Sequence, residues 1–161
     1  MDRERFEQAM LERQRKMEQY GYIVDSVFGY DVEVSHNFGK GIFFNIHTHG
    51  LKKNFNHPEV QIILPLADQV ASGIMNTVVE KFVVNGDGLK DGQVIKDLFN
   101  PGFDIVIKHH QQLNAYGEQE EFMRVMIPDE QNNIPTVGEA PDSLYAYQRE
   151  NIYPASENNI H

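Results

Sequence analysis

Histidines are the residues of this chain best suited to chemistry, and the sequence holds seven of them. His47 and His49 alternate in a segment rich in Ile and Phe, so on a β-strand their side chains would share one face, about 6.6 Å apart. Two imidazoles at that spacing can bind one metal ion, and His57 or His109 would add a ligand to a zinc or other divalent metal site. His109 and His110 face opposite sides of their strand, so at most one of them can join. The same pattern is also typical of hydrogen-bonded or solvated histidines.

The run His57-Pro58-Glu59 suggests a second kind of site. Pro58 fixes its own φ and favours an extended backbone at His57, which would hold this side chain rigidly at the end of a strand. His57 is therefore a candidate general base, oriented by Glu59 or Asn56, and His57 and Glu59 are the candidate catalytic residues. The structural alternative is that His57 braces its loop through hydrogen bonds to the backbone.

Other catalytic arrangements have little support in the sequence. There is no cysteine, which excludes disulfides and thiolate chemistry. The serines lie outside any nucleophile-elbow context, and the glycine turns at 39–41 and 86–88 match neither a P-loop nor a dinucleotide fingerprint. We expect no organic cofactor; a divalent metal is the one cofactor that the residues suggest.

Charge and hydropathy limit the partners. The formal net charge of -10 disfavours nucleic acid, because nucleic-acid binding depends on cationic contacts to phosphate. The basic cluster of Arg13, Arg15 and Lys16 is interleaved with glutamates and is interpreted as a solvated helix face. No apolar run is long enough to span a membrane, and no N-terminal apolar segment is present, so we expect a soluble, cytoplasmic protein. A protein partner, in particular a basic one, or a small ligand fits this surface.

The elements that must position these residues indicate an α+β fold. Strands are predicted over 22–28, 41–49, 60–64, 103–110 and 122–127, with a further candidate over 134–137. Residues 67–84 carry apolar side chains at spacings of three and four, which predicts the main helix, packed on the sheet. Because strictly alternating strands and helices are missing, we expect a mixed or mostly antiparallel sheet of five or six strands.

The chain length suits one domain with two appendages. Residues 2–20 predict an N-terminal helix, with Asp2 as its N-cap and Gly21 as its stop, lying on the domain with one edge buried. We therefore divide the chain into this helix at 1–21, a core domain at 22–137 and a polar, partly ordered tail at 138–161. Residues 52–58 are expected to form an irregular loop, and 39–41 a turn.

An ordered set of short motifs follows the histidine strand. It consists of Thr48, Gly50 and Leu51, the run Asn56-His57-Pro58-Glu59, an apolar strand, Leu64-Pro65, and a helix that contains Asn76. In this order the motifs resemble a bacterial family of domains of unknown function, with the pattern Thr-x-Gly-Leu, His-Pro-Glu and then Leu-Pro before a helix. Residues 125–135 resemble that family's closing strand and turn. The resemblance covers residues 22–137 and implies a fold and a bacterial origin, but no activity and no catalytic residues.

Three functional hypotheses follow, and they leave open whether the protein is an enzyme. The first is a non-catalytic binding or regulatory module, of an immunity or accessory type, that acts on a protein partner. The second is a metal-dependent hydrolase that uses His47, His49 and His57, with Glu59 as base or ligand. The third is a small-ligand-binding domain with its pocket between the loop at 52–57 and the strand that ends near His109.

Overall fold

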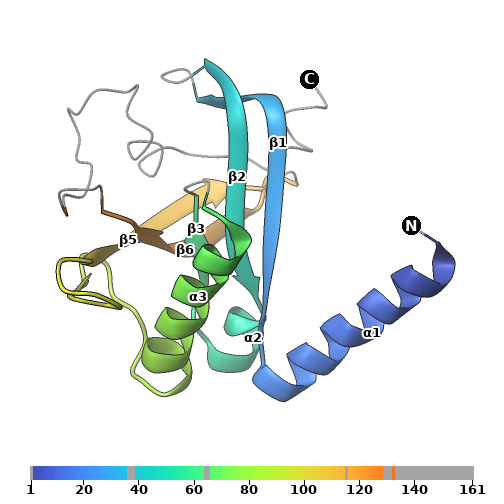
Figure 1. Ribbon diagram of the computed structural model, residues 1–161, viewed down its shortest axis with the longest axis horizontal. Helices are drawn as coiled ribbons and strands as arrows, with labels where there is room; N and C mark the ends of the chain where they lie inside the picture. Colours follow the sequence, from blue (N-terminus) through green and yellow to red (C-terminus); the bar gives the residue numbers. More distant parts are fainter. Residues whose placement is uncertain (1, 36–38, 64–65, 115, 129–131, 133–161) are drawn as a thin grey trace.

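The computed structural model describes residues 2–35, 39–63, 66–114, 116–128 and 132. This part of the chain forms a six-stranded sheet in the order β1-β2-β3-β6-β5-β4 (Figure 1). The strands are β1 (Ile23–Ser35), β2 (Gly39–His49), β3 (Glu59–Ile62), β4 (Val94–Ile95), β5 (Ile105–Leu113) and β6 (Gln119–Met126). Only the β3–β6 pair is parallel among these described strands. The predicted α+β class with a mixed sheet is confirmed.

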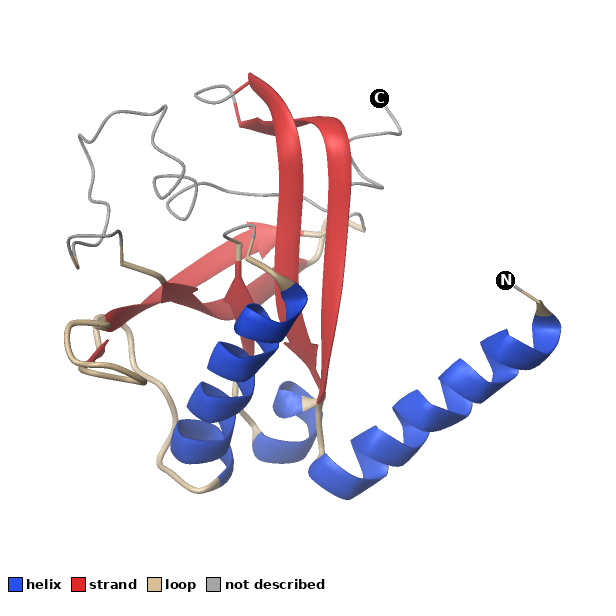
Figure 2. Cartoon of the chain, in the orientation of Figure 1, coloured by secondary structure: helices blue, strands red, loops and turns tan. Residues whose placement is uncertain are grey.

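The main helix covers one face of the sheet, as its apolar spacing predicts. It consists of α3 (Asp68–Val79) and a continuing π-helical turn, η1 (Glu80–Val84) (Figure 2). Its side chains Ile74, Met75 and Val78 are buried in one cluster with sheet residues such as Ile46 and Ile62. Burial of each large apolar side chain contributes about 1.5 to 3 kcal/mol, so this contact is the main source of rigidity for the sheet.

The opposite face of the sheet carries a row of polar residues. Strand register places Asp25 of β1 opposite His47 of β2, His47 opposite Gln61 of β3, and Gln61 opposite Arg124 of β6. Directly opposed residues point to the same side of a sheet, so these four side chains share a face. Gln61 and Arg124 are both buried. The face away from α3 is thus polar over four neighbouring strands.

Helix α1 (Arg3–Tyr20) has the predicted ends but not the predicted packing. The Asp2 side chain accepts a hydrogen bond from the Arg5 amide, and Gly21 ends the helix in the left-handed conformation. We expected one edge of α1 to be buried, but none of its residues is buried. The C-terminal end of the helix joins the domain, and its N-terminal end projects outward (Figure 1). Charged side chains of α1 contact one another along the helix, and its thin apolar stripe does not reach the core.

Two predictions of local structure are wrong. Residues 52–58 do not form an irregular loop throughout, because helix α2 (Leu51–Phe55) precedes β3. The side chain of Glu59, which comes after the helix, accepts hydrogen bonds from the first amides of α2, so the helix depends on a contact that no local pattern reveals. Residues 39–41 belong to β2 rather than to a turn.

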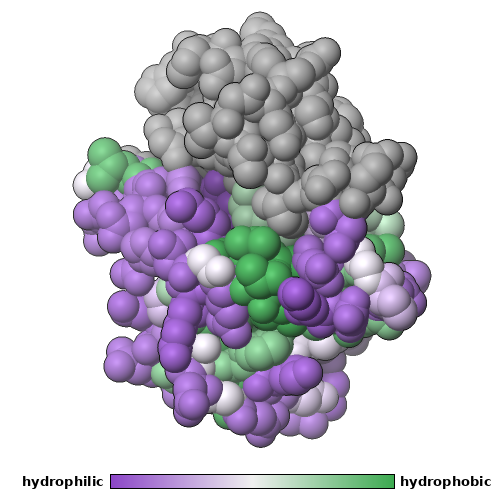
Figure 3. Space-filling view, turned by 90° about the vertical axis from the view of Figure 1, so that its left-hand side faces the viewer, coloured by the Kyte–Doolittle hydropathy of each residue, from purple (hydrophilic) through white to green (hydrophobic). Residues whose placement is uncertain are grey.

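Several predictions lie outside the described residues, namely the candidate strand over 134–137 and the tail at 138–161. Within the described part of the chain, no helix is both long and apolar enough to cross a membrane. On the face shown in Figure 3, apolar side chains gather in the middle, with hydrophilic ones on both sides.

Candidate functional site

His47 and His49 lie together on the polar face, as their alternation predicts. Their Nε2 atoms are 3.1 Å apart, and their rings meet edge to face with centroids 4.7 Å apart. His49 Nε2 also lies 3.1 Å from a carboxylate oxygen of Asp25. The same carboxylate forms an ion pair with Arg13 of α1. Polar contacts therefore connect α1 to the two histidines.

Arg124 fixes the hydrogens of this network from its other end. An arginine nitrogen can only donate, and Arg124 Nε donates to Gln61 Oε1 at 2.9 Å. Gln61 must then use its amide nitrogen toward Asn45 Oδ1, at 3.2 Å. Because Asn45 Oδ1 is an acceptor, His47 Nδ1, 3.2 Å away, carries the hydrogen of its imidazole. His47 Nε2 is consequently the acceptor for the hydrogen on His49 Nε2.

The local electrostatics agree with a neutral His47. Burial lowers the pKa of His47, the neighbouring His49 lowers it further, and Asp25 opposes both effects. Burial alone would raise the pKa of Asp25, but Arg13 and the two histidines outweigh burial and hold that pKa below its ordinary value. Near neutral pH the network thus combines the Arg13–Asp25 ion pair with an uncharged His47.

A cavity of about 480 Å³ opens beside these histidines. We call it the histidine cavity; its lining residues are Asn45, His47, Thr48, His49, Lys52, Glu59, Gln112, Gln119, Glu120, Glu121 and Phe122. The lining comes from β2, α2 and the adjacent ends of β3, β5 and β6. Three carboxylates and one ammonium group surround it, so its formal charge is negative while the imidazoles are neutral. Volumes of 300 to about 1,000 Å³ are typical of small-molecule sites.

His57 is held away from His47 and His49 by backbone groups. Its side chain is 7% exposed, and its Nε2 accepts a hydrogen bond from the Leu89 amide at 3.0 Å. The Nδ1 atom lies 2.6 Å from the Pro58 carbonyl oxygen, to which it donates. Both ring nitrogens are thereby engaged. This arrangement corresponds to the structural alternative, in which His57 braces its loop.

Glu59 does not orient His57 either. One carboxylate oxygen accepts hydrogen bonds from the Thr48 hydroxyl at 2.8 Å and the Leu51 amide at 3.2 Å, and the other accepts from the Lys52 amide at 3.2 Å. The Thr48 hydroxyl accepts in turn from the Val60 amide at 2.9 Å. Glu59 therefore joins the end of β2, the start of α2 and the start of β3, which accounts structurally for the Thr-x-Gly-Leu and His-Pro-Glu motifs.

Gly50 allows α1 to meet this junction. Its φ of 108° is left-handed, and an added Cβ would lie 2.6 Å from the Gly21 carbonyl oxygen and 2.7 Å from Met17 Sδ. The Asn54 side chain donates to the same Gly21 carbonyl at 2.8 Å. Only glycine permits this backbone geometry together with such a close approach. The C-terminal end of α1 is fixed here, next to the histidine cavity.

The structure does not bring the four candidate metal ligands together. His57 contacts Leu89, and His109 points to the face opposite His110, where its Nε2 lies 3.1 Å from Glu121 Oε1. Among the described residues, no group of three or more His, Asp or Glu side chains is placed to hold a metal ion. The metal-dependent hydrolase hypothesis is left with His47 and His49 alone.

Four residues of the network were not recognised in the sequence: Arg13, Asp25, Gln61 and Arg124. The sequence predicts a solvated position for Arg13, but Arg13 pairs with Asp25. The useful signal for the other three was a polar residue inside an otherwise apolar strand. Such a residue is buried only at a cost unless it is paired, so it predicts polar partners on neighbouring strands.

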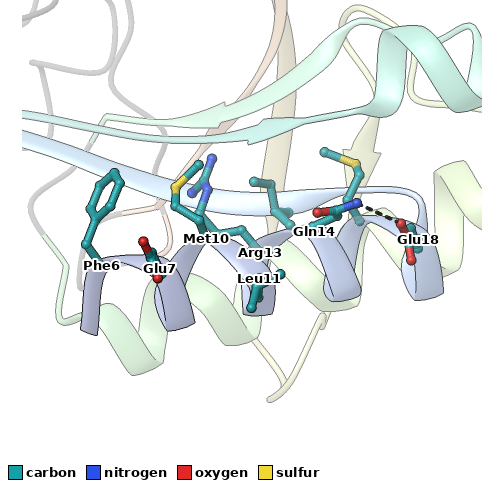
Figure 4. A pocket seen from close by; sticks show the side chains of 9 residues that line it. Phe6, Glu7, Met10, Leu11, Arg13, Gln14 and Glu18 are labelled. Atoms are coloured by element: carbon teal, nitrogen blue, oxygen red, sulfur yellow. Dashed lines mark hydrogen bonds between the residues drawn. The ribbon is translucent and has the colours of Figure 1, made fainter. Parts of the chain in front are cut away.

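A second surface lies along α1. An open groove of about 800 Å³ runs along one side of this helix to Ile23, the first residue of β1, and we call it the α1 groove. Its lining residues are Phe6, Glu7, Met10, Leu11, Arg13, Gln14, Met17, Glu18 and Ile23. In Figure 4, the side chains of Phe6, Met10 and Arg13 lie on the same side of α1. Phe6 is 57% exposed and Met10 is 50% exposed, so the groove is apolar and uncovered.

Comparisons with models of known protein families, with curated proteins and with solved structures find no match for this chain. The resemblance to a family of domains of unknown function therefore stays a prediction, and the geometry of the two surfaces carries the functional argument.

Proposed function

We propose that this protein is a non-catalytic binding or regulatory module that docks a helix of a protein partner in the α1 groove. The observation that carries the proposal is the exposure of Phe6 and Met10 on a helix with no buried residue. An isolated 18-residue helix gains little stability from local propensity alone, and most helices are stabilised by packing of their apolar face. The apolar side of α1 thus lacks the contact that such a face normally makes.

The spacing of the apolar residues favours a helical occupant. Successive residues on this side of α1 are four, three, four and three positions apart, in the order Phe6, Met10, Arg13, Met17 and Tyr20. This is the spacing of the two seam positions of a heptad repeat, in which side chains of one helix fit between those of another. An extended partner would instead be recognised by a row of main-chain hydrogen bonds at a strand edge.

The charges around the groove favour a basic occupant. Arg13, the one cation among the lining residues, is already paired with Asp25. The two lining carboxylates, Glu7 and Glu18, contact Arg3 and Gln14 only at the surface, where such contacts contribute little and exchange readily. The net charge of -10 adds long-range attraction for a basic protein. We therefore expect an amphipathic helix with Lys or Arg beside its apolar stripe.

The test uses a synthetic helical peptide with Leu at both seam positions and Lys at the flanking ones. Its matched control carries Glu in place of Lys. We expect the basic peptide to shift the backbone NMR signals of Phe6, Met10 and Ile23 in the full chain, and the acidic one to leave them unchanged. Met10→Glu should weaken binding by about tenfold or more, because it buries an unpaired carboxylate.

Val94→Glu is the control variant, because Val94 is 52% exposed on β4, at the opposite edge of the sheet. It should bind the basic peptide as the wild type does. Extracts of the cells that make the protein then provide the partner: a basic protein retained by the wild type and by Val94→Glu, but not by Met10→Glu, supports the proposal. Equal binding of both peptides, or a dimer of this chain that Met10→Glu dissociates, would contradict it.

A further inference from the structure

The histidine cavity has no role in the proposed docking, yet its polar groups are arranged for a ligand. Asn45 is 4% exposed and lines the cavity. The direction of the Arg124–Gln61–Asn45 hydrogen bonds leaves its amide nitrogen, not its oxygen, available. This nitrogen has no hydrogen-bond partner among the described residues. The residue is buried but this nitrogen is not fully enclosed, so a ligand acceptor or a water in the cavity can reach it.

The donor side of the cavity is completed by Lys52 and Gln112. The Gln112 side chain is buried, and its oxygen lies 3.2 Å from His110 Nε2, which leaves its amide nitrogen for the cavity. Lys52 lies at the start of α2, where Glu59 accepts from its backbone amide but makes no ion pair with its ammonium group. These groups suit a carboxylate or carbonyl oxygen.

The acceptor side comes from β6. Glu121 pairs with His109 at 3.1 Å, whereas the carboxylate of Glu120, a half-buried residue, has no hydrogen bond or ion pair within the described part of the chain. Phe122, next in sequence and buried, supplies the apolar wall. A carboxylate beside an aromatic ring is a suitable environment for an ammonium group.

We infer that the histidine cavity binds an amino-acid-like zwitterion, whose carboxylate meets the Asn45 and Lys52 donors and whose ammonium group meets Glu120. A ligand with both charges can pair with the donors and with the Glu120 carboxylate at the same time, whereas a simple anion or a simple amine can pair with only one of them. Hydrogen-bonding sites of this kind discriminate strongly, because an analogue that lacks one group leaves a site group unpaired. This inference is independent of the α1 groove.

The experiment screens free L-amino acids against the full chain by thermal shift and measures affinities by calorimetry. We expect at least one amino acid to bind and to raise the melting temperature. Its decarboxylated amine and its deaminated acid should each bind about tenfold more weakly or worse. No binding by any amino acid would overturn the inference. Equal affinity for the amine alone would also overturn it, since the cavity would then be a site for organic cations.

Two substitutions locate the ligand. Asn45→Asp keeps an acceptor for Gln61 and His47 but removes the amide donor, and it should weaken binding by about tenfold or more. Glu120→Gln removes a carboxylate outside the core, so the variant stays folded and should weaken binding by a similar factor. Glu118→Gln, at an exposed neighbour that does not line the cavity, should leave the affinity unchanged. Wild-type affinity in Glu120→Gln would contradict the assigned orientation.

Discussion

His57 and the pair formed by His47 and His49 differ in what their ring nitrogens contact. His57 contacts the backbone on both sides, through the Leu89 amide and the Pro58 carbonyl. His47 and His49 contact side chains and each other, and they border a cavity. The three residues are of one type and lie close together in sequence, but their different contacts give them different roles. His57 satisfies backbone groups and is part of the architecture, whereas His47 and His49 belong to a side-chain network that borders the cavity.

The motifs around His57 follow the same rule. Thr48 and Glu59, which come from these motifs, satisfy the backbone amides of Leu51, Lys52 and Val60. Such hydrogen bonds stabilise the fold whatever the domain binds. The neighbouring histidine cavity combines backbone rigidity with unpaired polar groups, and this combination is what a binding site needs.

The largest effect that can test this comparison is expected at Glu59. Glu59→Ala removes the acceptor of three hydrogen bonds and should destabilise the protein by about 3 kcal/mol, because the donors lose a charged partner. Urea unfolding measures the loss. Glu120→Ala, at the other side of the cavity, should change stability by no more than about 0.5 kcal/mol. Similar losses in the two variants would remove the distinction between the regions.

A smaller difference is expected between the histidines themselves. His57→Ala leaves the Leu89 amide buried without an acceptor and should cost about 2 kcal/mol. His49→Ala, whose side chain is 51% exposed, should cost about 0.5 kcal/mol. Hydrogen exchange at the Leu89 amide provides the specific measurement, and it should accelerate only in His57→Ala. An unchanged exchange rate there would show that the hydrogen bond does not stabilise the native state.

The smallest effect concerns pH. Burial, and next the nearby Arg124, lower the pKa of His110 from 6.5 to about 4. The unfolded chain therefore takes up a proton below about pH 6.5 that the folded chain takes up only near pH 4, so this group lowers stability progressively as the pH falls across that range. Because His110 is partly exposed, we expect the contribution to be about 1 kcal/mol.

His110→Gln isolates this contribution, because glutamine keeps a donor toward Gln112 but does not titrate. Urea unfolding of the wild type and the variant between pH 7 and pH 4 gives the comparison, and the variant should lose about 1 kcal/mol less than the wild type. Carboxylates titrate equally in both proteins and cancel in the difference. Parallel curves would mean that His110 is as accessible to protons in the folded state as in the unfolded one.

Much of this fold was predictable because it follows local periodicity. The spacing over 67–84 predicted α3 and η1, the alternation over 41–49 predicted the shared face of His47 and His49, and Asp2 and Gly21 predicted the ends of α1. Local patterns failed where a distant residue decides the structure. Helix α2 depends on hydrogen bonds to Glu59, which lies beyond its C-terminus. Helix α1 has no buried residue, and this depends on where the helix lies relative to the sheet rather than on its own sequence.

The candidate site divides in the same way. By itself, the sequence determined an α+β domain, its acidic charge and the pairing of His47 with His49, because composition and periods of two or three to four residues act along the chain. Only the tertiary structure decided that His57 is architectural, that Arg124 orients a hydrogen-bond network across four strands, and that an apolar groove stays open beside α1. These features arise from contacts between residues far apart in sequence, which strand register and helix placement create.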